Sequence, residues 1–175
     1  MQIIAERIAM SMKKAVPDRT ASVEVLKFGL VTLISNVSVV LLAIIFGLFI
    51  GMLKETVLTI LTVALLRFII GGIHFRSMLV CMLVSVVVLT ILPLIPINNT
   101  WIVILTVLSV LIILVFAPSN IANKTRIPEK HFRLLKFSAA IIVSLNFFFL
   151  SGIFAKGCFT ASLGIVKFRR RGRGV

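Results

Sequence analysis

The chemistry-bearing residues near the middle of the chain are His74 and Cys81, seven positions apart. A thiolate is the reactive form of cysteine, and a nearby imidazole can accept the thiol proton and return it to a leaving amine. On one unbroken helix, seven residues rise about 10 Å, far beyond the roughly 2.6–3.2 Å of a hydrogen bond. The pair therefore works only if the helix is broken. Gly71-Gly72 supply such a break, because glycine adopts backbone angles closed to other residues.

The helix predicted after this break would favour the reactive form of the thiol. Ser77 is a suitable N-cap, which leaves Cys81 about one turn inside the helix. The positive end of the helix and the neighbouring Arg76 both favour a thiolate, and His74 on the preceding loop could fold back within reach. Each residue also has an ordinary structural explanation, such as packing, an interfacial position or a helix stop. Their order in one 15-residue window favours the catalytic interpretation.

The elements that position these residues must lie in a membrane. Hydrophobic residues make up 60% of the 175 and charged residues only 14%, whereas soluble domains have about 45–50% and about 25%. No charged side chain occurs in 28–53 or 77–123, and the mean hydropathy is +1.20. Asp18 is the only aspartate and the chain has only five acidic residues, so chemistry based on paired carboxylates has very few residues available to it. The two cysteines are too few for a zinc site, and we expect neither metal nor cofactor.

Apolar runs of membrane-spanning length predict an all-α, polytopic integral membrane protein with five or six transmembrane helices. An amphipathic N-terminal segment precedes them, since Ile4, Ile8 and Met12 share one helical face before Pro17; a loose polar N-terminus is the alternative. The chain is one membrane domain, 1–175, with an N-terminal part, a transmembrane region and a basic tail at 1–27, 28–166 and 167–175. The predicted spans are 28–53, 56–73, 77–92, 101–116 and 137–155, with 157–166 as a short sixth.

The net charge of +14 is explained by membrane orientation rather than by binding to nucleic acid. Five basic residues lie in each of 1–27, 117–136 and 167–175, and none lies in the turn at 93–100. The positive-inside rule then predicts cytoplasmic termini, a cytoplasmic 117–136 loop and an external turn, which requires six crossings. The basic residues of the loop are Lys124, Arg126, Lys130, Arg133 and Lys136.

The order of these residues resembles the accessory gene regulator B (AgrB) family, which are membrane-embedded cysteine endopeptidases of Gram-positive quorum sensing. The family pattern is an arginine, a Gly-Gly-x-His motif and a cysteine seven residues after the histidine. The matching positions here are Arg67, Gly71, Gly72, His74 and Cys81. The first span opens with KFGLVTLISN, and a basic loop containing a proline precedes the fifth span, as in the family. The resemblance covers roughly residues 20–150.

The resemblance implies that the substrate is a small membrane-associated precursor peptide of the AgrD type. Cys81 would attack the peptide bond behind the signal segment, with His74 as general base and then acid. The resulting thioester would be displaced by an internal Cys or Ser, which closes a thiolactone or lactone ring. Arg67 would contact an acidic group of the precursor or anchor the structure. Lys124, Arg126, Lys130 and Arg133 could bind an acidic precursor tail, although topology alone also explains these charges.

Two other functions fit parts of the sequence. A small transporter, channel or scaffold without enzymatic activity explains the apolar content and the charge pattern, but not the cluster of Arg67, Gly71-Gly72, His74 and Cys81. An AgrB-like protein could also process a peptide with a role outside quorum sensing. The expected partners are the precursor peptide and the lipid bilayer, without nucleic acid, and self-association into a homo-oligomer is left open.

Overall fold

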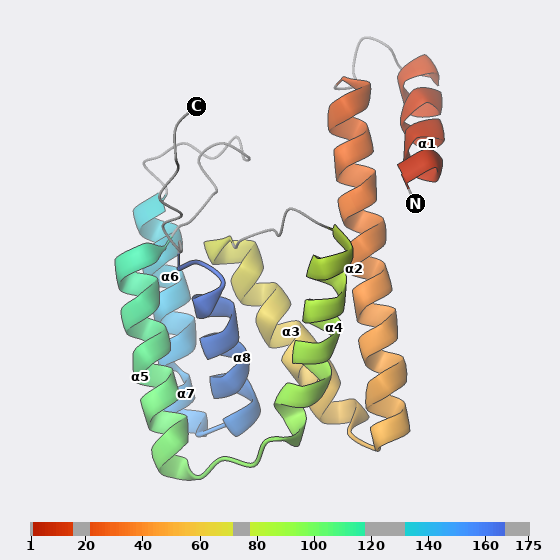
Figure 1. Ribbon diagram of the computed structural model, residues 1–175. Helices are drawn as coiled ribbons and strands as arrows, with labels where there is room; N and C mark the ends of the chain where they lie inside the picture. Colours follow the sequence, from red (N-terminus) through yellow and green to blue (C-terminus); the bar gives the residue numbers. More distant parts are fainter. Residues whose placement is uncertain (1, 16–21, 72–77, 118–131, 167–175) are drawn as a thin grey trace, which may run out of the picture.

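The computed structural model describes residues 2–15, 22–71, 78–117 and 132–166, and its elements are helices (Figure 1). The predicted all-α class is therefore confirmed. In chain order the helices are α1 (Gln2–Ala15), α2 (Val23–Ile50), α3 (Leu53–Ile70), α4 (Met78–Leu94), α5 (Asn99–Phe116), α6 (Phe132–Ser144), α7 (Asn146–Phe149) and α8 (Gly152–Leu163).

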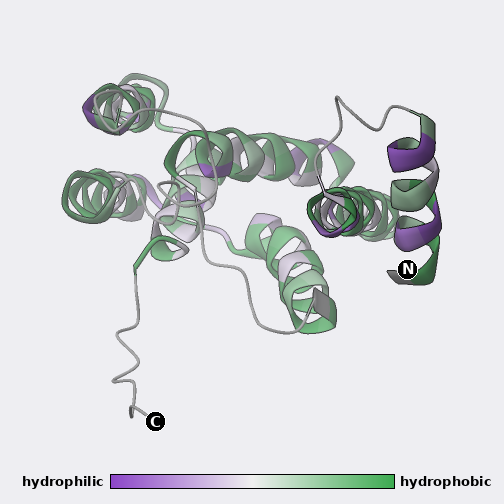
Figure 2. Cartoon of the chain, turned by 90° about the horizontal axis from the view of Figure 1, so that it is seen from above, coloured by the Kyte–Doolittle hydropathy of each residue, from purple (hydrophilic) through white to green (hydrophobic). Residues whose placement is uncertain are grey.

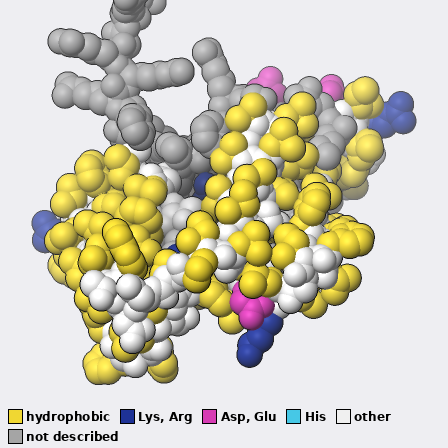
Figure 3. Space-filling model, turned by 60° about the horizontal axis from the view of Figure 1, so that its bottom comes forward, with side chains coloured by type: hydrophobic (Ala, Val, Ile, Leu, Met, Phe, Trp, Pro, Cys, Tyr) yellow, Lys and Arg dark blue, Asp and Glu magenta, His cyan; other side chains and the backbone are white. Residues whose placement is uncertain are grey.

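Several of these helices have the length and apolar composition of membrane spans. They are α2, α5 and the continuous stretch Phe132–Phe149, while Leu79–Leu94 is a shorter apolar helix. Figure 3 shows hydrophobic side chains over much of the molecular surface, and Figure 2 shows that the hydrophilic residues gather on α1 and at the helix ends. A helical protein with this apolar exterior is a membrane protein.

The helices cross the bundle in alternating directions (Figure 1). We call the "turn end" the end formed by the short connections 51–52, 95–98 and 150–151, and the "loop end" the opposite end, where α3, α5 and α8 finish. Helices α2, α4 and α6 run toward the turn end, and α3, α5 and α8 return. The C-terminal helix α8 thus completes a sixth passage through the bundle. Which end faces the cytoplasm remains a prediction.

The predicted fifth span, 137–155, is wrong at both of its ends. Helix α6 begins at Phe132, and the chain reverses at Leu150, which has φ +47°. Ser151 then caps α8, and its side-chain oxygen accepts a hydrogen bond from the Phe154 backbone N–H at 3.4 Å. Ala155 therefore belongs to the returning helix. The Ser151-Gly152 pair is the only local turn signal here, and it lies within an otherwise apolar run that reads as one continuous span.

Asn146 holds this turn in place from inside the bundle. The residue is 2% exposed, its Nδ2 donates to Thr106 Oγ1 at 2.9 Å, and its Oδ1 accepts from the Ser151 backbone N–H at 3.0 Å. An Asn146→Leu substitution leaves a buried N–H without a partner, so we expect it to lower the free energy of unfolding by about 1–3 kcal/mol. The thermal midpoint in detergent measures this loss.

The exposed Asn99 at the start of α5 provides the matched control for Asn146. An Asn99→Leu substitution leaves no buried group unpaired, so it should change stability by no more than about 0.5 kcal/mol. Equal midpoints for the two variants would show that the Asn146 hydrogen bonds do not stabilise the turn.

Two packed cores share helix α3. The larger lies between α3, α5, α6 and α8 and is made of buried apolar residues such as Leu66, Ile113 and Val143. The smaller joins α2 and α4 with the middle of α3 through Val39, Ala43, Val86 and Leu89. Helix α3 therefore connects the α2–α4 pair to the rest of the bundle.

Helix α1 packs against the N-terminal part of α2, which extends beyond the other helices at the loop end (Figure 1). Ala5 and Ala9 are fully buried in this contact, and Lys27 Nζ lies 2.6 Å from Glu6 Oε2. The predicted N-terminal helix is present. Its apolar stripe of Ile4, Ile8 and Met12 is exposed.

Candidate functional site

The end of α3 is determined by the first glycine of the Gly-Gly pair. Gly71 has φ +79° and ψ −160°, a backbone conformation that other residues rarely adopt. Its N–H donates to the Arg67 carbonyl at 3.0 Å, and the helix stops at Ile70. The chain can therefore change direction directly before the predicted histidine.

Cys81 is the fourth residue of α4, because this helix begins at Met78. The thiol-bearing residue is half-buried, and it is a free cysteine. The three-residue separation corresponds to about 4.5 Å from the start of the helix. Cys81 is thus close to the N-terminus of α4, directly after the segment 72–77.

The other half of the predicted catalytic pair lies outside the described residues. His74 and Gly72 fall in the segment 72–77, as does the predicted cap Ser77, and Lys124, Arg126 and Lys130 fall in 118–131. Arg133 is described, and it is exposed in the first turn of α6. The geometry between histidine and cysteine therefore remains a prediction.

Arg67 is half-buried in the last turn of α3 and reaches toward the C-terminal end of α8. A Cβ atom built on Gly164 would lie 3.9 Å from Arg67 Nη2. On the same side, Leu66, Ile70 and Ile165 pack together in the larger core. A cation at the negative end of a helix is favourable, so this position is consistent with the anchoring role.

Arg67 and Cys81 lie at similar distances from the turn end of the bundle. Arg67 is 14 residues after Leu53, or about 21 Å along α3, and Cys81 is 13 residues before Leu94, or about 20 Å along α4. Both side chains therefore lie toward the loop end, at the two helix termini that flank residues 72–77.

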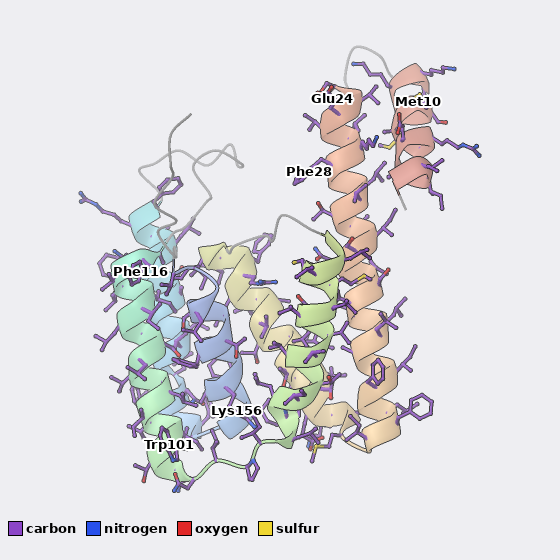
Figure 4. All side chains as sticks on the ribbon, viewed as in Figure 1. Met10, Glu24, Phe28, Trp101, Phe116 and Lys156 are labelled. Atoms are coloured by element: carbon purple, nitrogen blue, oxygen red, sulfur yellow. The ribbon has the colours of Figure 1, made fainter. Side chains whose placement is uncertain are left out.

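Sequence analysis missed Lys156, a buried cation in α8. Its side chain is 8% exposed, and Nζ donates to the Ile95 carbonyl at 2.7 Å (Figure 4). The hydrogen bond attaches α8 to the turn between α4 and α5, far along the bundle from Cys81. The only signal in the sequence was a single lysine within an apolar stretch, and nothing there indicated its partner. Cys158, predicted to pack, is fully buried in the larger core.

A cavity of about 300 Å³ lies between α3, α6, α7 and α8. Its lining is mostly apolar and includes Leu58, Asn146 and Phe154, but none of the predicted site residues. Leu58 is near the start of α3, so the cavity lies toward the turn end. It is therefore separate from the end of the bundle where Arg67 and Cys81 are found.

Comparison with known proteins identifies a family for the whole chain. The model of the family described as "Accessory gene regulator B" matches residues 5–168. No curated protein and no solved structure matches the chain. The match covers all of the described helices apart from the first three residues of α1, together with the complete Arg67–Cys81 window. The chain therefore belongs to the accessory gene regulator B family.

Proposed function

We propose that this protein is a membrane-embedded cysteine endopeptidase that cleaves an AgrD-like precursor peptide and helps to close a cyclic (thio)lactone signal. Membership of the AgrB family associates the chain with autoinducer processing. The observation that carries the catalytic proposal is the half-buried Cys81 near the N-terminus of α4, which follows the segment that contains His74.

Cleavage proceeds by acyl transfer to the thiol. His74 accepts the Cys81 proton, and the thiolate attacks the carbonyl carbon behind the signal segment. The C–N bond breaks as His74 donates the proton to the leaving amine. The C-terminal fragment leaves, and the N-terminal portion of the precursor remains bound to Cys81 as a thioester.

Ring closure is the second acyl transfer. An internal thiol or hydroxyl of the precursor loses its proton to His74 and attacks the thioester carbonyl. The bond to Cys81 Sγ breaks, and the Cys81 thiol regains a proton from His74. Exclusion of water prevents hydrolysis of the thioester, and a site at the edge of the membrane supports this exclusion.

Basic residues supply the proposed contacts with an acidic precursor tail. Arg133 is exposed at the loop end, and Lys124, Arg126 and Lys130 are close to it in sequence. Arg67 either contacts an acidic group of the precursor or anchors α3 to α8. The positive-inside rule places these residues on the cytoplasmic side, where the precursor is made.

A trapped thioester tests the proposal directly. An AgrD-type precursor peptide is co-expressed in a form whose internal nucleophile is replaced by Ala, so that the second acyl transfer cannot occur. We expect a covalent adduct on the wild-type protein that hydroxylamine releases, and mass spectrometry should place it on Cys81.

The Cys158→Ala variant should form the same adduct, because Cys158 is fully buried in the core. Absence of an adduct, together with processing that does not need Cys81, would contradict the mechanism. That outcome would favour a transporter or scaffold without enzymatic activity.

A further inference from the structure

Asn36 is an unpaired amide on a membrane-spanning helix. It is the only carboxamide in the charge-free stretch 28–53, and it is exposed. The hydroxyls of Thr32 and Ser38 on the same helix donate to carbonyl oxygens four residues earlier, at 2.8 and 2.9 Å. The Asn36 side chain makes no such bond within the described part of the chain. Among the described residues, its two N–H donors and its carbonyl thus have no hydrogen-bond partner.

The amide lies at the edge of the buried face of α2, since the buried Val39 is about 60° away round the helix. Ala43 and Gly47 follow Asn36 by seven and eleven residues, and at about 100° per residue they point within about 20° of the same direction. Ala43 is fully buried in the smaller core, and Gly47 packs against Thr56 of α3. Asn36 is exposed on this face because α3 leaves α2 and ends beside α8 (Figures 1 and 2).

Asn36 and Cys81 lie at the same height in the bundle. Asn36 is 14 residues before Ile50, or about 21 Å along α2, and Cys81 is about 20 Å before the end of α4. The two helices pack together and run in the same direction. A bilayer core is about 30 Å thick, so both residues lie within the membrane depth, where an unpaired amide is costly.

We propose that Asn36 binds the peptide backbone of the precursor beside Cys81. Its Nδ2 donates to a carbonyl oxygen of the precursor and its Oδ1 accepts from an N–H. A precursor segment that enters the membrane in extended form needs partners for these groups, and an amide side chain matches both. A second copy of the protein fits less well, since it would meet the outer face of α2, which carries Leu41. This inference rests on the proposed peptidase function.

Peptide binding to a non-catalytic variant tests the inference. The full-length Cys81→Ala protein is reconstituted into liposomes and titrated with an AgrD-type precursor peptide that is labelled with a fluorophore at its N-terminus. When Asn36→Leu, which keeps the side-chain size, is combined with Cys81→Ala, the Kd for the precursor should rise at least tenfold. Adding Ser38→Ala should change it less than twofold, because that hydroxyl is satisfied within its own helix. Equal Kd values for the Leu variant and its parent would overturn the inference, whether or not its oligomeric state changes.

Chemical labelling gives a second readout that does not depend on the Leu variant. Asn36→Cys is placed in a protein with Cys81→Ala and Cys158→Ala, and a small membrane-permeant maleimide, which can reach thiols at membrane depth, is added. We expect labelling at position 36 that the precursor slows at least fivefold. Leu41→Cys, about 140° round the helix on the outer face, should show no protection. Equal protection at both positions would overturn the inference. Both assays use proteins without the Cys81 thiol, so their results do not depend on whether Cys81 is the nucleophile.

Discussion

Cys81→Ala is expected to lower the rate of precursor cleavage by about 10⁴-fold or more, since loss of a catalytic nucleophile leaves only binding and electrostatic effects. His74→Ala should lower the rate by about 10²–10⁴-fold, the usual contribution of a general acid–base group. The two effects should not add in the double variant, because the residues act as one unit.

Co-expression with an N-terminally tagged precursor measures these losses. The shortened precursor is quantified for each variant, together with the amount of protein in the membrane. Cys158→Ala is the matched control, because this cysteine is fully buried in the larger core and should leave cleavage within about twofold of wild type. Cleavage that persists in Cys81→Ala would exclude the thiol mechanism and favour the transporter or scaffold function.

The helices that carry the site could be predicted from the sequence because lipid requires long uninterrupted apolar runs. The run that contains Cys81 illustrates this, since 77–92 was predicted and α4 extends from Met78 to Leu94. The prediction failed at Leu150, where a buried asparagine holds a turn that only the Ser151-Gly152 pair marks in the sequence. Such a turn depends on Thr106, 40 residues away from Asn146, and a local pattern cannot show it.

The candidate site was only partly accessible to sequence reasoning. Arg67, Gly71 and Cys81 could be found because they lie in one short window with a recognisable order. Asn36 could not be found in this way. Its exposure depends on the path of α3. This helix packs on α2 near Gly47 and then ends beside Gly164 of α8. Only the three-dimensional arrangement shows that this amide is exposed at the edge of the buried face of α2, without a hydrogen-bond partner among the described residues.

Gly47→Val is expected to lower the free energy of unfolding by about 3 kcal/mol, at the upper end for overpacking a well-packed contact. A Cβ on Gly47 would lie 2.7 Å from Thr56 Oγ1 and 2.9 Å from Thr56 Cβ, so the clash involves an atom that side-chain rotation cannot move. Thr56 is 1% exposed and has little space to withdraw. The thermal midpoint in detergent measures the loss. Since α2 and α3 must then separate, cleavage should fall as well.

Gly29→Val on the same helix is the matched control for Gly47. A Cβ at Gly29 has no atom within 4 Å, so this variant should be neutral or gain a few tenths of a kcal/mol from the better helix former. Adding Thr56→Ala to Gly47→Val removes Oγ1 and Cγ2 of Thr56 but keeps its Cβ, so it should restore part of the lost thermal midpoint. The coupling energy between the two substitutions then measures this contact. Equal midpoints for Gly47→Val and Gly29→Val would show that the α2–α3 contact tolerates a side chain. The path of α3 away from Asn36 would then have to depend on its packing against α8 alone.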